Sequence, residues 1–297
     1  MSGGLKPGQA VGLTFRQPCD FASLLRFLRE RALPGVETVD ATSYARVSGT
    51  PQAPAWVRIT CVAGGTRLRL ETHGAIGRDA AVTRVRQLFD LDADPAAITA
   101  ALGTDPLLAP LLARHPGLRV PGAWDGFEIA VRAVLGQQVS VAAARTLATR
   151  LIQRHGTRLA QAPYTGLDYL FPTPAVLAEA DLDGLGMTGA RVATIRGIAR
   201  ALLEGRASLA RGQALPDFVA RWTTLPGIGD WTAHYMAMRI LGHRDAFPAA
   251  DIVLRRAAAA PGAMLSAKAL AARAEAWRPL RSYAVLQLWR STWHEEE

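Results

Sequence analysis

Cysteine, lysine and long apolar runs are all scarce in this chain of 297 residues. Its two cysteines, Cys19 and Cys61, are too few for a disulfide scaffold, a cysteine-rich zinc ribbon or a four-cysteine iron–sulfur cluster. No apolar stretch approaches the roughly 18 residues of a membrane span, and residues 1–10 lack the apolar segment of a signal peptide. The sequence therefore indicates a cytoplasmic protein that is neither secreted nor embedded in a membrane.

The same scarcity excludes several kinds of site. The histidines show neither a His-x-x-x-His spacing nor a cysteine-paired one, so we expect no transition-metal site. Lys6 and Lys268 are the only lysines, which leaves few candidates for a Schiff-base nucleophile. No pattern in the sequence requires a cofactor, and we expect none.

Arginine, in contrast, is abundant, and it gives the chain a formal net charge of +9 and a pI near 10.5. Most of the excess lies after residue 120. This balance favours a polyanionic partner, either a nucleic acid or an anionic membrane surface. Arginine suits bidentate phosphate contacts, although its abundance also fits an Ala- and Arg-rich codon bias. Charge alone narrows the class of partner and does not identify it.

The first ~90 residues have the alternation of β-strands. Residues 56–62 and 68–70 alternate on either side of Gly64 and Gly65, which predicts an antiparallel hairpin with the glycines at positive φ in its turn. Between flanking strands, residues 21–31 carry apolar side chains at helical spacing and predict an amphipathic helix. With 49% hydrophobic and 20% charged residues, the composition is that of a globular protein.

From about residue 79 the periodicity becomes helical and stays so. We therefore predict an α+β protein, with an antiparallel-sheet domain over residues 1–120 and an all-α region over residues 121–297. The stretch 118–122, with its Pro and Gly, marks the boundary, and residues 161–174 form a connecting loop. The predicted helices cover residues 82–88, 127–135, 141–154, 191–203, 218–223, 231–241, 252–260 and 267–277.

Residues 225–233 read Leu-Pro-Gly-Ile-Gly-Asp-Trp-Thr-Ala and lie between two predicted helices. Gly227 and Gly229 allow a tight reversal in which Ile228 points inward and backbone N–H groups point outward at a helix N-terminus. That arrangement binds phosphate, although a plain connector between helices also fits the pattern. A similar turn at residues 182–188 precedes another basic helix.

Asp251 follows Pro248 in a short loop, twenty residues after Trp231, and precedes an apolar helix. One interpretation is an N-cap residue whose carboxylate also pairs with Arg255 at i+4. The other is a functional carboxylate at a helix N-terminus, facing a cleft where positive charge develops. The spacing leaves both interpretations open.

Taken together, several segments resemble the helix-hairpin-helix DNA glycosylases, most closely the bacterial DNA-3-methyladenine glycosylase II branch. Residues 37–40, 44–46 and 86–91 resemble the additional α+β domain of that branch, so the resemblance covers essentially the whole chain. The combination is far more specific than any single motif. The segments of the catalytic part are 132–140, 225–233, Asp251 and 277–284.

The resemblance implies a helix-hairpin-helix core with two helical subdomains flanking a base pocket. It also implies a monofunctional, monomeric glycosylase that excises alkylated purines, such as 3-methyladenine and 7-methylguanine, from double-stranded DNA in base excision repair. Two alternatives stay open at this point. One is a glycosylase for deaminated or oxidised bases, and the other is a non-catalytic DNA-binding protein.

Site residues follow from the resemblance position by position. Asp251 matches the catalytic aspartate, and aromatic faces suit a cationic base because cation–π attraction is about 0.5–2 kcal/mol or more. Ordinary helix-core packing is the alternative for these rings. The base-pocket positions are Phe27, Trp231, Tyr235 and Trp289; the DNA-binding positions are Gln137, Gln138, Gly227, Ile228, Gly229 and Thr232; and a monovalent cation would bind the carbonyls of Thr223, Leu225 and Ile228.

Two positions depart from the pattern of the best-known members, and two more bear on the mechanism. Gln138 stands where a leucine wedges into the duplex, and Ile252 stands where an aromatic lines the pocket. Asp230 is an acidic residue within a hairpin that should face phosphate. Trp231 occupies the position of the Schiff-base lysine in relatives that also cleave the strand, so strand cleavage is not expected.

Overall fold

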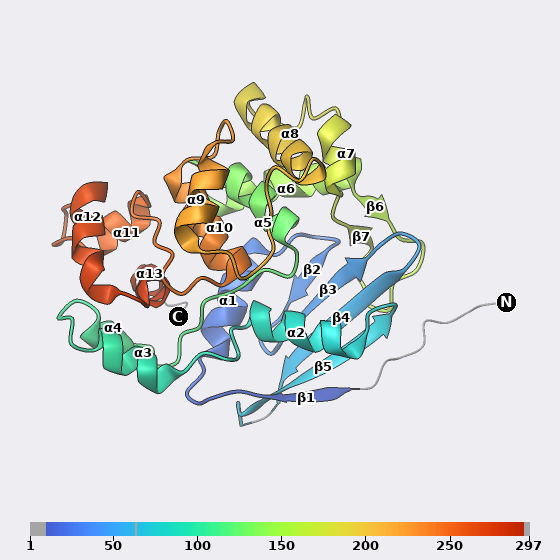
Figure 1. The fold of residues 1–297 in the computed structure, drawn as a ribbon. Coiled ribbons are helices and arrows are strands. Elements are labelled where there is room, and N and C mark those ends of the chain that lie inside the picture. Colours follow the sequence, from blue (N-terminus) through green and yellow to red (C-terminus); the bar gives the residue numbers. More distant parts are fainter. Residues whose placement is uncertain (1–9, 63, 294–297) are drawn as a thin grey trace.

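A five-stranded antiparallel sheet forms the N-terminal part of the computed structural model, which describes residues 10–62 and 64–293. The predicted hairpin is confirmed, since Cys61 pairs with Leu68 and the turn has Gly64 at φ 88° and Gly65 at φ 68°. In the order in which they lie side by side (Figure 1), the strands are β1 (Val11–Thr14), β5 (Arg67–Gly74), β4 (Pro54–Cys61), β3 (Ser43–Gly49) and β2 (Glu37–Val39).

Helix α1 (Phe21–Arg31) has the predicted bounds, and together with α2 (Arg78–Leu88) it packs against one face of the sheet. Asp20 begins α1 by accepting a hydrogen bond from the Ser23 amide at 2.9 Å. Because side chains alternate along a strand, every second residue faces these helices. The sheet residues of this core are Leu13, Tyr44, Val57, Ile59, Leu68 and Leu70.

The opposite sheet face packs against the helical part of the chain. Ala45, Val47 and Trp56 belong to the same core cluster as helices from the second half, and the Trp56 indole donates to the Leu167 carbonyl at 2.8 Å. The sheet and the helices therefore share a core. The division of the chain at residue 120 stays a prediction.

The α+β prediction is confirmed, because the elements after β5 are almost all helical. They are α2, α3 (Pro95–Leu102), α4 (Ala109–Arg114), α5 (Gly126–Leu135), α6 (Val141–His155), α7 (Pro174–Glu179), α8 (Gly189–Leu203), α9 (Leu215–Thr223), α10 (Asp230–Met236), the π-turn η1 (Ala237–Leu241), α11 (Ile252–Ala257), α12 (Ala267–Ala274), the 3-10 turn η2 (Glu275–Trp277) and α13 (Arg281–Arg290).

One part of the all-α prediction is wrong. Strands β6 (Thr157–Arg158) and β7 (Tyr169–Leu170) form a two-stranded sheet between α6 and α7. Two residues are too few to show an alternating pattern, so the sequence carried no signal for them. A tertiary contact supports the pair, because the Tyr169 amide donates to the Gly35 carbonyl at 2.9 Å.

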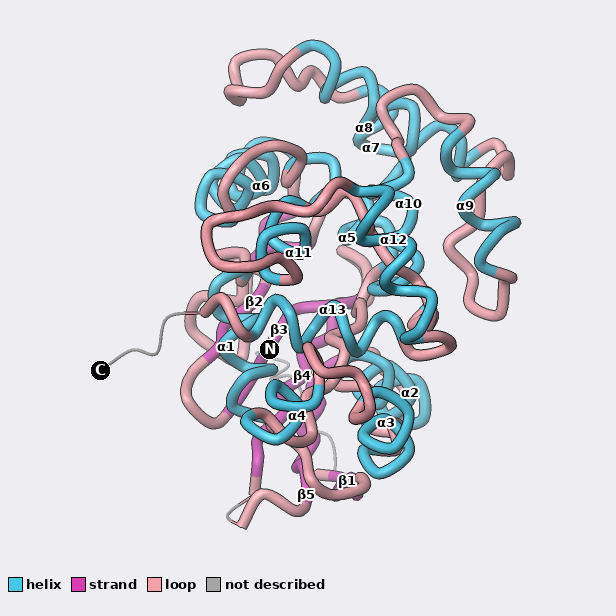
Figure 2. The backbone as a smooth tube through the Cα atoms, turned by 90° about the vertical axis from the view of Figure 1, so that its left-hand side faces the viewer, coloured by secondary structure: helices cyan, strands magenta, loops and turns pink. Residues whose placement is uncertain are grey.

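The chain folds back so that its last helix, α13, lies beside α1. Figures 1 and 2 show α13 near α4, and the Arg290 side chain at the end of α13 donates to the Ser23 hydroxyl of α1 at 3.1 Å. This closure places the end of α13 beside α1, α10 and α11. Among the residues that the structure describes, no helix is long and apolar enough to span a bilayer.

Candidate active site

A cleft of about 1100 Å³ lies between α1, α5, α6, α10, α11 and α13. It brings together Asp251 and all the predicted base-pocket residues, which come from three different helices and a loop. Gly227 and Ile228 do not belong to the lining. The predicted residues that do are Phe27, Gln137, Gln138, Gly229, Trp231, Thr232, Tyr235, Asp251 and Trp289.

Asp251 is held in the cleft entirely by N–H donors. It is the N-cap of α11, where its Oδ1 accepts from the amides of Val253 at 2.9 Å and Leu254 at 3.0 Å. The indole of Trp231 donates to Oδ2 at 3.0 Å, and the indole of Trp289 donates to Oδ1 at 3.4 Å. Hydrogen bonds to an ionised acceptor are stronger than neutral ones, so these donors stabilise the carboxylate and fix its orientation.

The N-cap interpretation of Asp251 is confirmed, its functional interpretation stays a prediction, and the predicted pairing with Arg255 is wrong. Arg255 donates instead to the Leu265 carbonyl at 2.7 Å. Within residues 10–62 and 64–293, no Lys, Arg or His side chain forms an ion pair with Asp251. Its negative charge therefore faces the cleft without a compensating cation.

The predicted aromatic residues form one continuous wall. The rings of Trp231 and Tyr235 stack with centroids 5.4 Å apart at 12°, and Trp289 lies 6.3 Å from Tyr235. Phe27, contributed by α1, stacks on Trp289 at 6.4 Å. Phe27 is buried, whereas Trp231, Tyr235 and Trp289 keep partly exposed faces in the cleft. Trp293, which the sequence analysis missed, extends the wall 6.5 Å from Phe27.

Two arginines on the cleft floor were also missed. Arg31 lies 3.8 Å from the centroid of the Phe27 ring, and Arg239 lies 4.8 Å from the same ring and donates to the Tyr235 hydroxyl at 2.7 Å. Each arginine follows a pocket aromatic by four residues on its own helical segment. Side chains at this spacing are neighbours, so the pairs Phe27/Arg31 and Tyr235/Arg239 were the signal in the sequence.

The Tyr235 phenol has an unusual electrostatic setting. Burial alone would raise the pKa of Tyr235, but the guanidinium groups of Arg239, Arg31 and Arg132 and the hydrogen bond from Arg239 together lower it. Nearby positive charge favours the phenolate, which accounts for the direction. In turn, burial lowers the pKa of Arg239 and of Arg31.

The hairpin has the geometry expected of it. Ile228 is 5% exposed and its amide closes the turn on the Leu225 carbonyl at 3.0 Å. Gly227 has φ +84°, and a Cβ there would lie 1.9 Å from the Thr194 hydroxyl oxygen, so this position requires glycine. Gly229 has no neighbour within 4 Å of such a Cβ and leaves the amides at the start of α10 open.

Gln137 and Thr232 join the loop after α5 to the hairpin. The Gln137 side-chain amide donates to the Gly227 carbonyl and to the Thr232 hydroxyl, both at 3.0 Å. Thr232 is 2% exposed, and its hydroxyl is occupied by the hydrogen bond from Gln137. Gln138 is exposed beside the cleft at φ +56°. DNA binding by these residues stays a prediction.

Departures from the family pattern lie at the edge of the cleft. Ile252 is 50% exposed there, together with the partly exposed Val253. The Asp230 carboxylate lies 3.5 Å from His234 Nε2, one turn further along α10. Among the described residues no group of three or more His, Cys, Asp or Glu could hold a metal ion. The monovalent-cation site at the carbonyls of Thr223, Leu225 and Ile228 stays a prediction.

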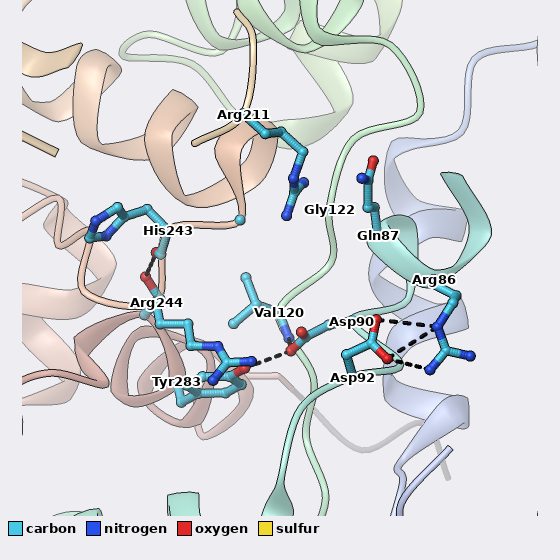
Figure 3. A pocket seen from close by; sticks show the side chains of 12 residues that line it. Arg86, Gln87, Asp90, Asp92, Val120, Gly122, Arg211, His243, Arg244 and Tyr283 are labelled. Carbon is cyan, nitrogen blue, oxygen red and sulfur yellow. Dashed lines mark hydrogen bonds and ion pairs between the residues drawn. The ribbon is translucent and has the colours of Figure 1, made fainter. Parts of the chain in front are cut away.

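A second cavity, of about 120 Å³, lies apart from the cleft and shares no lining residue with it (Figure 3). The Tyr283 hydroxyl donates to Asp90 at 2.9 Å, and Arg86 pairs with Asp92. Burial raises the pKa of Asp90. Four side chains that line this cavity thus bond to one another in two pairs, Tyr283 with Asp90 and Arg86 with Asp92. The lining contains no wall of aromatic rings that could hold a base.

Comparison with known proteins agrees with this geometry. Residues 10–125 match the family model of the AlkA N-terminal domain, and residues 131–282 match that of the HhH-GPD superfamily base excision DNA repair protein. The solved 3-methyladenine DNA-glycosylase from Archaeoglobus fulgidus superposes with a TM-score of 0.80 over 94% of this chain and 97% of that one. At 21% identity, that likeness shows a common fold.

Two relatives are more similar in sequence. The probable bifunctional transcriptional activator/DNA repair enzyme AlkA of Mycobacterium tuberculosis (strain H37Rv) is 39% identical over 96% of this chain, which spans only 57% of that protein. DNA-3-methyladenine glycosylase 2 of Escherichia coli (strain K12) is 35% identical over 96% of this chain and 99% of its own length. With its hairpin, its aspartate and both domain matches, the chain belongs to the HhH-GPD superfamily of base excision DNA repair proteins, in the branch that carries the AlkA N-terminal domain.

Proposed function

We propose that this protein is a monofunctional DNA glycosylase that releases alkylated purines, such as 3-methyladenine and 7-methylguanine, in base excision repair. The observation that carries the proposal is the Asp251 carboxylate, which faces an aromatic cleft without a compensating cation. The E. coli relative, whose whole length the chain nearly spans, is named a DNA-3-methyladenine glycosylase.

Asp251 supplies the negative charge that hydrolysis of an N-glycosidic bond requires. As the bond between base and sugar breaks, positive charge develops on the sugar, and a carboxylate fixed in a partly water-excluded cleft stabilises it. The same carboxylate orients a water molecule and accepts its proton. The indoles of Trp231 and Trp289 hold the carboxylate before the reaction begins, so little reorganisation is needed.

The aromatic wall recognises the damaged base. The base must leave the stack to reach the cleft, which costs a few kcal/mol and least for a damaged pair. A purine alkylated at a ring nitrogen is cationic, so the faces of Trp231, Tyr235 and Trp289 attract it. That positive charge also makes the base a good leaving group, which removes the need for a strong acid.

The side chains near the site support base release without cleavage of the DNA strand. Trp231 occupies the position at which a Schiff-base lysine would stand, and its indole is bonded to Asp251. Lys268 lies on α12 and is absent from the cleft lining, and Lys6 lies outside the described residues.

The partner is double-stranded DNA that contains alkylated bases. Backbone amides of Gly227, of Gly229 and of the start of α10 bind phosphate, and the arginine excess attracts the duplex. The protein acts as a monomer in the cytoplasm. No cofactor takes part in this mechanism.

Release of free base from methylated duplex DNA tests the proposal. The wild-type chain should release 3-methyladenine and 7-methylguanine and leave an intact strand with an abasic site, and Asp251→Asn should bind the DNA without releasing base. Binding by the wild-type chain without base release would instead indicate a non-catalytic DNA-binding protein. Release of only deaminated or oxidised bases from a panel of defined lesions would overturn the assigned substrate.

A further inference from the structure

Two neighbouring rings of the aromatic wall are hydrogen-bonded to side chains of opposite charge. Trp231 is bonded to the Asp251 carboxylate, and the adjacent Tyr235 is bonded to the Arg239 guanidinium at 2.7 Å. Arg31 and Arg132 also line the cleft and act electrostatically on Tyr235. A site built only for cationic bases has no use for positive charge beside the base, so this arrangement needs its own explanation.

The positive charge of Arg239 is not neutralised by a partner. Arg239 is 3% exposed, donates to the carbonyls of Pro121 and Gly122, and forms no ion pair within the described part of the chain. Arg132, by comparison, pairs with Glu37 and Glu128. Glu37 and Glu128 also pair with Arg46. Arg31 pairs with Glu30 at 3.2 Å. Arg239 therefore leaves the cleft floor positive.

Tyr235 differs from the two buried tyrosines Tyr44 and Tyr283 in what its hydroxyl does. Tyr44 donates to Glu37 at 2.6 Å and Tyr283 donates to Asp90 at 2.9 Å. Burial, together with these neighbouring carboxylates, raises the pKa of both phenols. The Tyr235 oxygen instead accepts from Arg239, and its proton has no acceptor among the residues that the structure describes. Its O–H group is therefore a free and strengthened donor in the cleft.

Breaking the glycosidic bond moves an electron pair onto the base. An alkylated, cationic base becomes neutral, but an uncharged purine becomes negative and benefits from a donor aimed at it. We propose that the Tyr235 hydroxyl, polarised by Arg239 and Arg31, donates a hydrogen bond to a departing uncharged purine and stabilises the arriving electron pair. The sugar gains a hydroxyl from a water whose proton Asp251 accepts, the free base takes a proton from a second water, and the resulting hydroxide removes the proton from Asp251.

This role rests on the proposed glycosylase function, and it assigns different side chains to two classes of base. The aromatic faces serve cationic bases, whose departure needs no donor. The Tyr235 hydroxyl and its arginines serve purines without a charge. Removal of the hydroxyl alone should therefore change the ratio of release rates between the classes, which a general packing role would not do.

Tyr235→Phe tests the assignment, because it keeps the ring and its stack on Trp231. Single-turnover release is measured from matched oligonucleotides that contain 7-methylguanine, as the cationic base, or hypoxanthine, as the uncharged one. We expect hypoxanthine release to fall about tenfold or more and 7-methylguanine release to fall less than about threefold. The matched control is Tyr164→Phe, a tyrosine that lies against His73 on the sheet and should change neither rate.

A second pair of variants tests the charge. Arg31→Gln should lower hypoxanthine release selectively, and Arg31→Lys, which keeps the charge, should restore most of it. Equal losses on both bases in Tyr235→Phe, or the same ratio in Arg31→Gln and Arg31→Lys, would overturn the inference. If the wild-type chain released neither base, the proposed function itself would fail, which is a different result.

Discussion

Asp251 and the buried carboxylates Glu37 and Glu128 lie in opposite surroundings. Glu128 is 1% exposed and pairs with Arg46 and Arg132, both at 2.8 Å. Glu37 shares the same two arginines. Asp251 is only half buried, and N–H groups of two indoles and two amides are its partners. One region neutralises its charges, and the other leaves a negative charge available.

This difference separates charged groups that stabilise the fold from charged groups that are candidates for function. The network of Glu37, Glu128, Arg46 and Arg132 joins the sheet to α5 and is internally balanced, so it contributes to structure. Dipoles orient the Asp251 carboxylate without cancelling its charge, so the charge remains able to stabilise a developing cation. Four helices begin at an aspartate N-cap, but in the described structure Asp251 alone among those caps lines the cleft.

Breaking the buried network should give the largest loss of stability. Glu128→Gln leaves two buried guanidinium groups with too little negative charge, and removal of one partner from a buried pair costs about 3–5 kcal/mol. Asp251→Asn should cost under about 1 kcal/mol, because Asn caps helices as well as Asp does. Urea unfolding of both variants measures the contrast. An equal loss of stability in the two would erase the distinction between the regions.

A substitution in the hairpin tests whether the protein binds DNA phosphates through the backbone amides of this turn. Gly227→Ala places a Cβ on Thr194 at φ +84°, which should cost about 1–3 kcal/mol in strain and shift the turn. Affinity for damaged and undamaged duplexes should fall alike, because phosphate contacts carry no base information. Gly197→Ala, at a position with open space on α8 and outside the cleft lining, is the matched control. A loss confined to damaged DNA would place the hairpin in base recognition.

Trp289 tests the aromatic side of the cleft. Trp289→Ala should cost about 0.5–2 kcal/mol in discrimination between cationic and neutral bases, because cation–π attraction exists only when the base is charged. General duplex affinity should change less. Ile252→Tyr, which adds an aromatic at the cleft edge, should move activity toward cationic lesions. Single-turnover release from oligonucleotides with each lesion measures both effects, and equal losses for both classes would indicate packing alone.

The smallest expected effect concerns a third carboxylate, Asp40, in the turn between β2 and β3. Slight burial raises its pKa, but hydrogen bonds from Ser43 and Thr42 lower the value to about 2. A lowered folded-state pKa adds stability above the unfolded value of about 3.9, and that stability is lost as the pH falls toward 2. Asp40→Asn should therefore flatten the acid limb of a urea-midpoint titration. An unchanged acid limb would contradict this role.

Much of this structure could be predicted where local signals were strong. The helix Phe21–Arg31 and the hairpin at Gly64 and Gly65 follow from periodicity and turn chemistry. The position of Asp251 before a helix was also predicted, although spacing alone could not separate the cap from the functional role. The indole bonds from Trp231 and Trp289, residues distant from Asp251 in the chain, show that the capping carboxylate also belongs to the aromatic cleft.

Other features depend on contacts between distant residues. Residues 281–288 of α13 are all buried, so this helix lacks the one-sided pattern that marks a surface helix. Three arginines of the cleft lining are far apart in the chain, namely Arg31 of α1, Arg132 of α5 and Arg239 of η1. Such clusters arise only when the elements pack together.

The central claim is that the uncompensated Asp251 carboxylate performs the reaction. Its most direct test is the single-turnover release of 7-methylguanine from one oligonucleotide by the wild type, Asp251→Asn and the N-cap control Asp125→Asn. We predict that Asp251→Asn retains less than about a tenth of the wild-type rate, a loss above ~1.4 kcal/mol, with DNA affinity unchanged. Asp125→Asn should retain the wild-type rate. Retention of more than a tenth by Asp251→Asn would contradict the assignment.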